Sequence, residues 1–315
     1  MKKLLIPIII LNSINLSASD TDETSYLDSI INNTKEYRKY IHESLMTTSS
    51  SIDNYYFDEK EHLKKEYNTT YGLIELSSYY NQHEGIKFDQ KVRIKLELPK
   101  LKDRLKLLFE SDDERVTKDF IEDHTQNNND NFNLALAYNK LLNYDIDFST
   151  KIGIKLKSNL NPFVKVQAKK TWKDIKGIDY TVSQALKESV DKNLEATSYL
   201  RLDKKLNDYY SVHNYNEYYW HSDNEGDSEF YHSVYLNQKL SKKNQLSYIL
   251  DTNIDNINSD IKVKRYSAKV GFRHFIKSWL YTDVVPENYY KEDLDFKPKY
   301  AIRVNLGMYL NKDSY

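Results

Sequence analysis

Residues 144–157 read YDIDFSTKIGIKLK, and this stretch decides the fold. Its even positions carry Tyr, Ile, Phe, Thr, Ile, Ile and Leu, whereas its odd positions carry Asp, Asp, Ser, Lys, Gly, Lys and Lys. Because successive side chains of a β-strand point to opposite faces, one face is apolar and the other is charged. A tilted strand crosses the hydrocarbon of a bilayer with about 9–11 residues. The stretch is therefore typical of a strand with lipid on one side and water on the other.

The same alternation recurs along the chain and predicts the fold class. We predict an all-β fold, an antiparallel transmembrane β-barrel of about 14 strands with a short N-terminal helical segment. The expected strands are 68–80, 86–98, 103–111, 130–141, 143–157, 160–172, 178–190, 193–204, 206–220, 228–240, 244–256, 260–274, 276–285 and 296–311. About 12 strands are the alternative if 68–80 and 276–285 are misread. An even count places both chain ends on the periplasmic side.

Residues 1–19 have the three parts of a secretory signal peptide. Lys2 and Lys3 are basic, residues 4–11 are apolar, and the segment ends in small residues at 17–19. Such a peptide is cleaved on export, and its apolar part is too short to span a bilayer. We therefore expect the mature chain in the cell outer membrane, with a periplasmic helical segment at 20–67 and the barrel at 68–311.

The expected helical segment follows the signal peptide. Apolar side chains recur there at three- and four-residue steps, at Leu27, Ile30, Ile31, Tyr37, Ile41 and Leu45. This spacing predicts a helix over 20–47. The Ser/Thr run from 46 to 51 is expected to end it, and a second, more charged helix is expected over 52–67.

Composition excludes several classes of protein. The 315-residue chain has no cysteine, so a disulfide framework, a lipid-modified cysteine, a thiolate zinc site and a cysteine nucleophile are all excluded. Lysine and arginine number 46 against 47 acidic residues, which argues against a nucleic-acid partner because such proteins carry a basic excess. The 28 tyrosines suit a membrane boundary, where an apolar ring with a polar tip is favoured.

The charged strand faces are the candidate functional surface. A Lys or Arg facing lipid costs roughly 2–4 kcal/mol at the bilayer midplane, so the charged parity should face inward. The pore-lining candidates are Arg93, Lys95, Asp145, Asp147, Lys151, Lys155, Lys165, Lys169, Arg201 and Arg303. Rings of such charges can tune ion selectivity. The alternative is that opposite charges pair across the interior and fill it.

No local motif assigns catalytic, metal or cofactor chemistry. The histidines lack the H-E-x-x-H spacing, although His213, His221 and His232 could meet near one end of a hairpin. Serine, aspartate and histidine are all present, but a triad is recognised by geometry and no spacing arranges one here. We therefore predict no catalytic residue, no metal ligand and no cofactor, and leave enzymatic activity open.

The segment 49–114 carries a longer motif, whose core at 91–114 reads KVRIKLELPKLKDRLKLLFESDDE. This segment resembles a group of proteobacterial exported proteins of uncharacterised activity. In that group a helical N-terminal segment precedes a strand pair with the pattern R-x-K/R-x-x-L-P-x-L-x-x-R-L-x-L-x-F-x-x-D/E-D. The resemblance implies an exported chain with a barrel-like β region and implies no activity. The chain departs from the usual barrel ending, because Tyr315 is out of phase with the apolar face.

Three functional hypotheses follow from these patterns. The first is an integral outer-membrane barrel that acts as a small-solute channel or as a structural barrel. Its partners would be outer-membrane lipid, the barrel-insertion machinery and small solutes. The second is a barrel-embedded hydrolase of the lipase or protease type. The third is a soluble periplasmic β-sandwich, whose apolar faces would pack against each other.

Overall fold

The computed structural model describes residues 23–56, 70–98, 105–111, 132–156, 160–223, 227–257 and 260–310. The signal peptide predicted at 1–19 lies outside this set. Two compact units divide the chain, Met1–Ile41 and His42–Tyr315. Every described strand belongs to the second unit.

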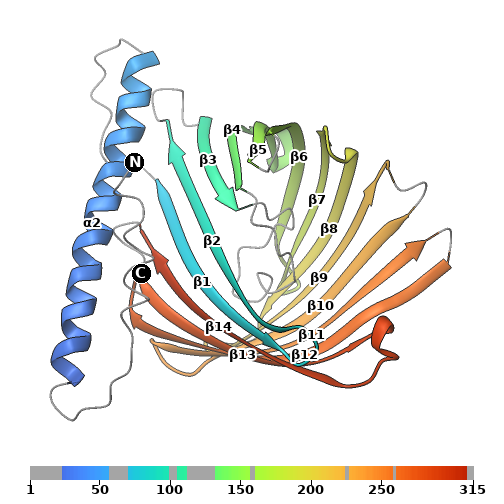
Figure 1. The fold of residues 1–315 in the computed structure, drawn as a ribbon. Helices are drawn as coiled ribbons and strands as arrows, with labels where there is room; N and C mark the ends of the chain where they lie inside the picture. The colour runs from blue at the N-terminus through green and yellow to red at the C-terminus, as the bar shows by residue number, and fades with distance from the viewer. Residues whose placement is uncertain are drawn as a thin grey trace. The chain divides into compact units, whose positions relative to one another are not determined.

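The strands form one closed antiparallel barrel in which each strand pairs with its sequence neighbours. The first and last strands, β1 and β14, pair with each other and close the barrel, as Figure 1 shows. The strands are β1 Tyr71–Asn81, β2 Gly85–Glu97, β3 Leu105–Ser111, β4 Phe132–Leu142, β5 Ile146–Leu156, β6 Leu160–Ile175, β7 Ile178–Ser189, β8 Asn193–Lys205, β9 Tyr210–His221, β10 Ser228–Lys239, β11 Asn244–Ile257, β12 Asp260–Lys277, β13 Leu280–Lys291 and β14 Lys299–Tyr309. The fold prediction is confirmed, and closure excludes the β-sandwich.

Both strands whose assignment was open are present, so the lower strand count is wrong. Residues 68–80 correspond to β1, but 276–285 lie too early for β13, which is Leu280–Lys291. Pro286 directly follows the end that was expected for this strand. It instead pairs with Ile302 on β14, while the pairing of β13 with β12 is interrupted beside it. Proline lacks the N–H that a strand donates to its neighbour, so an interrupted ladder on one side accommodates it.

The N-terminal part contains one helix, α2, which spans Glu23–Tyr56 over 34 residues. The helix end predicted at 46–51 is therefore wrong. Thr47 and Thr48 donate their hydroxyl groups to the carbonyls of Glu43 and Ser44, each at 2.8 Å. A hydroxyl that bonds to the carbonyl four residues earlier is compatible with a continuous helix. Of the second predicted helix, 52–56 belongs to α2 and 57–67 lies outside the described residues.

In the described part of the chain, no helix combines the length and the apolar character that a membrane span requires.

The two faces of β5 have the predicted parity. Ile152 is 60% exposed and Ile154 is 38% exposed. Lys155, the next residue along the strand, is only 1% exposed. The strand begins at Ile146, later than expected, because residues 143–145 form a short 3-10 turn. Other exposed apolar side chains share the outer face, among them Leu134, Leu136, Val164, Val182, Leu186, Leu200, Leu250, Ile302 and Val304. The barrel exterior is therefore a broad apolar surface.

Small inward-facing residues let longer side chains reach across one strand. Tyr281 on β13 donates its hydroxyl to Glu75 on β1 at 2.6 Å, and it passes over Gly307 of the intervening β14. A side chain at 307 would collide with the ring of Tyr281. Tyr289 likewise donates to Asn81 at 2.5 Å. These contacts tie β13 to β1 across β14 and reinforce the barrel where its two ends meet.

Candidate functional site

The candidate site is the inner face of the barrel. Lys151 pairs with Ala137 on β4 and with Lys165 on β6 in the strand register, and Asp147 pairs with Lys169. Lys151, Lys165 and their register partners thus form one continuous row of inward-facing positions. On the same face lie Arg93 and Lys95 of β2, Lys155 of β5, Arg201 of β8 and Arg303 of β14.

Asp145 is the exception among the predicted residues. It lies in the turn between β4 and β5, has a φ of 56° and is exposed, so it belongs to neither strand face. The predicted strand, 143–157, therefore starts three residues too early. Aspartate tolerates this left-handed backbone better than most residues, which suits it to the turn.

Positive charge is concentrated on the inner face of β2 to β7, which we call the basic wall. Its cations are Lys87, Lys91, Arg93, Lys95, Lys106, Lys151, Lys155, Lys165, Lys169 and Lys187. The inward carboxylates described on the same strands are fewer, namely Asp89, Glu110, Asp147 and Asp179. The basic wall therefore has a net positive charge.

Water reaches part of the basic wall, whereas Lys155 and Lys187 at one end of it are buried. The side chains of Arg93, Lys151 and Lys169 are 24%, 27% and 36% exposed although they point inward. Glu110 bonds to Lys151 at 3.1 Å and lies 3.7 Å from Arg93, and Lys151 reaches it across β4. Ala135 and Ala137 are the β4 residues at this crossing, and their small side chains leave room for it.

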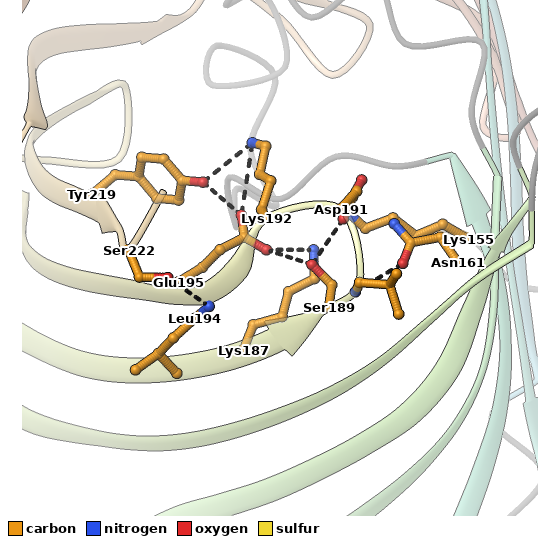
Figure 2. A network of polar contacts seen from close by, with 11 residues as sticks. Lys155, Asn161, Lys187, Ser189, Asp191, Lys192, Leu194, Glu195, Tyr219 and Ser222 are labelled. Atoms are coloured by element: carbon orange, nitrogen blue, oxygen red, sulfur yellow. Dashed lines mark hydrogen bonds and ion pairs between the residues drawn. The ribbon is translucent and has the colours of Figure 1, made fainter. Parts of the chain in front are cut away.

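An ion-pair network lies where β7 and β8 meet, at the barrel end opposite the start of β1 and the end of β14, and its side chains are drawn in Figure 2. Glu195 is 2% exposed and is held by Lys187 at 3.3 Å and Lys192 at 3.7 Å. Tyr219 donates to the same carboxylate at 2.5 Å. Lys155 lies 3.7 Å from Asp191 in the loop between β7 and β8. Sequence reasoning had placed Lys155 on the inner face but had not grouped it with these partners.

The inner face of β11 to β13 is built differently, and we call it the packed wall. Arg273 and Asp283 form two hydrogen bonds of 2.7 Å. Lys269 lies 2.9 Å from Asp251 and 3.7 Å from Glu287. These side chains are nearly inaccessible, with Asp283 at 0% and Lys269 at 4%.

In the packed wall, opposite charges pair along the wall itself. Its ion pairs link neighbouring strands and do not cross the interior. An apolar cluster of Tyr235, Ile249 and Val285 lies on the same side. One side of the interior is therefore filled, while the other presents solvated cations.

The three histidines considered for one end of a hairpin do not form a group. His213 and His221 share the inner face of β9 with Tyr215, whereas His232 has the opposite parity and bonds to Asn216 at 2.8 Å. The described residues contain no group of three or more histidines and carboxylates that could hold a metal ion.

This geometry defines a closed antiparallel barrel with a charged interior. No family model matches the chain, and no curated protein matches it in sequence.

Several solved structures match in fold. The outer membrane channel DcaP of Acinetobacter baumannii has 8% identity and a TM-score of 0.48, covering 76% of this chain and 96% of that one. A bacterial polysaccharide outer membrane secretin has 13% identity and a TM-score of 0.47, covering 77% and 98%. The KdgM porin has 10% identity and a TM-score of 0.36, covering 75% and 98%. Because these sequence identities and TM-scores are low, we infer function from the strand register and the inner surface of this chain.

Proposed function

We propose that this chain is an integral outer-membrane channel for small solutes that favours anions. The observation that carries this is the solvated basic wall inside a closed barrel of 14 strands. Barrels of 8 strands are filled by side chains and barrels of 16 to 18 strands leave an aqueous channel, so this size stands between the two. A wall of one charge sign raises the local concentration of counter-ions and sets ion selectivity.

The apolar exterior supports the membrane location. Water-soluble monomers rarely expose apolar patches larger than a few hundred Å², whereas exposed large apolar side chains lie here on every strand from β4 to β12 and on β14. The leader at 1–19 supports export to the outer membrane, with insertion by the barrel-assembly machinery. On this proposal the segment 20–67 is periplasmic, and the chain belongs with the exported proteins that share its 91–114 motif.

Planar-bilayer recording tests the channel. Full-length mature protein, refolded in detergent, is added to a bilayer that separates two KCl concentrations. We expect stepwise currents and a reversal potential of the sign that anion preference produces. The double variant Lys151→Glu/Lys165→Glu inverts two facing charges of the basic wall and should move the reversal potential toward cation preference.

Lys170→Glu is the matched control. Lys170 lies on β6 beside the basic wall but has outward parity, since it pairs with Val182. Its single charge inversion, half the change made by the double variant, should leave the reversal potential unchanged. A folded protein that inserts but passes no current would overturn the channel and leave a structural barrel. Equal shifts in the control and the double variant would show that the basic wall does not set selectivity.

A further inference from the structure

Ser211, His213 and Asp203 form a hydrogen-bonded chain on the inner face of β8 and β9. The Ser211 Oγ lies 2.9 Å from His213 Nε2, and the His213 Nδ1 lies 2.5 Å from Asp203 Oδ1. With Nδ1 protonated, the imidazole donates to the carboxylate and Nε2 accepts the serine hydroxyl. These are the contacts by which a serine nucleophile, a general base and an orienting carboxylate act together.

The strand register explains why these three residues meet. Ser211 and His213 are two positions apart on β9, so both face inward. His213 pairs directly with Asp203 on β8. The two strands are joined by a short turn, so the site needs only one hairpin. No linear motif could have revealed it, because the contact between His213 and Asp203 depends on the register of the hairpin.

The surroundings hold the imidazole in one orientation. The ring of Tyr235 stacks on His213, with centroids 4.5 Å apart and planes at 13°. Arg201 donates from Nε to the same Asp203 oxygen at 2.8 Å, so the carboxylate is fixed from a second side. An imidazole whose plane and tautomer are both fixed is suited to accept a proton from one defined donor.

The serine lies where a solute could meet it. Ser211 is half-buried near the start of β9, at the barrel end where the described part of β1 begins and β14 ends. The His213 side chain is 13% exposed. Asn237 on β10 pairs with Ser211, and its side-chain oxygen Oδ1 accepts a hydrogen bond from the Ser247 hydroxyl at 2.6 Å. The amide N–H of Asn237 is therefore the group it can offer to a developing oxyanion beside Ser211.

We propose that this hairpin is a serine esterase site acting on small carboxylic esters that enter the barrel. Ser211 Oγ attacks the ester carbonyl while its proton passes to His213 Nε2. The tetrahedral adduct collapses, the C–O bond to the alcohol breaks, and His213 returns the proton to the leaving alkoxide. Water then attacks the acyl-serine, gives its proton to His213, and releases the carboxylic acid as Ser211 regains its hydrogen. Asp203 is a positioning residue in this scheme.

A fluorophosphonate probe tests the nucleophile on the full mature chain in detergent. Attack by Ser211 forms an O–P bond and expels fluoride, and the serine proton passes through His213 to solvent. We expect one adduct, on the peptide that contains Ser211. Ser211→Ala should abolish labelling, and His213→Asn should slow it by about 100-fold or more, the usual range for removing a general base.

The matched control is Ser183→Ala, because Ser183 faces inward on β7, accepts a hydrogen bond from Gln167 and has no histidine partner among the described residues. It should label like the parent. With p-nitrophenyl butyrate, Asp203→Asn should lower kcat while leaving KM unchanged, an effect that a general loss of packing would not produce.

Two results would overturn the esterase. One is a folded parent chain, shown by heat-modifiable migration, that takes no label. The other is labelling that persists in Ser211→Ala. Ser211→Ala should conduct ions like the parent in bilayers, so failure of the esterase and failure of the channel are distinguishable.

Discussion

Gly307 has no side chain and so leaves space for a neighbouring ring. It lies between Glu75 and Tyr281 in the register, and the ring of Tyr281 occupies the place of a side chain at 307. The guanidinium carbon of Arg273 lies 3.9 Å from the centre of the same ring. The contact that joins β13 to β1 therefore depends on the absence of a side chain on β14.

Replacing Gly307 with Val should lower the free energy of unfolding by about 1–3 kcal/mol, the usual cost of overpacking an interior. Urea unfolding in lipid vesicles, followed by the fluorescence of the three tryptophans, measures the change. Ala268→Val is the control, because Ala268 lies on the exposed outer face of β12. Equal effects of both changes would contradict the packing of Tyr281 over Gly307.

The buried pair of Arg273 and Asp283 gives a second prediction at this scale. Asp283→Leu alone should destabilise the barrel by about 3–5 kcal/mol, because it leaves a buried guanidinium without its carboxylate. Arg273→Met with Asp283→Leu should recover much of that loss. Unfolding of the parent, both single variants and the double variant measures the coupling. Additive effects would mean that the two side chains do not interact.

At the scale of the element, the period-two pattern succeeded where each strand has a wet and an apolar face. It reported parity on β5 without any knowledge of the neighbouring strands, because alternation is a property of a single strand. It failed at strand ends and at the Ser/Thr run of α2. At these places, the position where the element ends depends on which backbone groups form hydrogen bonds with side-chain hydroxyls or with neighbouring strands. Residue type alone does not determine those hydrogen bonds.

The outer face of β5 can be tested against its inner face. Ile152→Arg places a charge at an outward position that is 60% exposed, near the middle of the strand. We expect a loss of roughly 2–4 kcal/mol in lipid, because the cation must leave water. Ser149→Arg, on the inner face of the same strand, should be tolerated. Folding yield into vesicles measures both, and equal tolerance would contradict lipid contact at Ile152.

For the whole molecule, closure decides how the protein behaves on extraction. A closed sheet has no free edge, so partial opening breaks a complete hydrogen-bond ladder. We expect the protein to remain in membranes through high salt, to require detergent for release, and to migrate faster on gels before heating than after. Release by salt alone would contradict the membrane proposal.

The sequence by itself determined the class of fold and the parity of most strands, because alternation is a local property of the chain, whereas it left the strand number between about 14 and 12. The parity that it predicted for the inner cations agrees with the strand register, and that these cations line a pore stays a prediction. Only the tertiary structure decided that cations gather on β2 to β7 while β11 to β13 pair and pack. The same holds for the meeting of Ser211, His213 and Asp203. These arrangements follow from register and closure, which join residues that no single strand brings together.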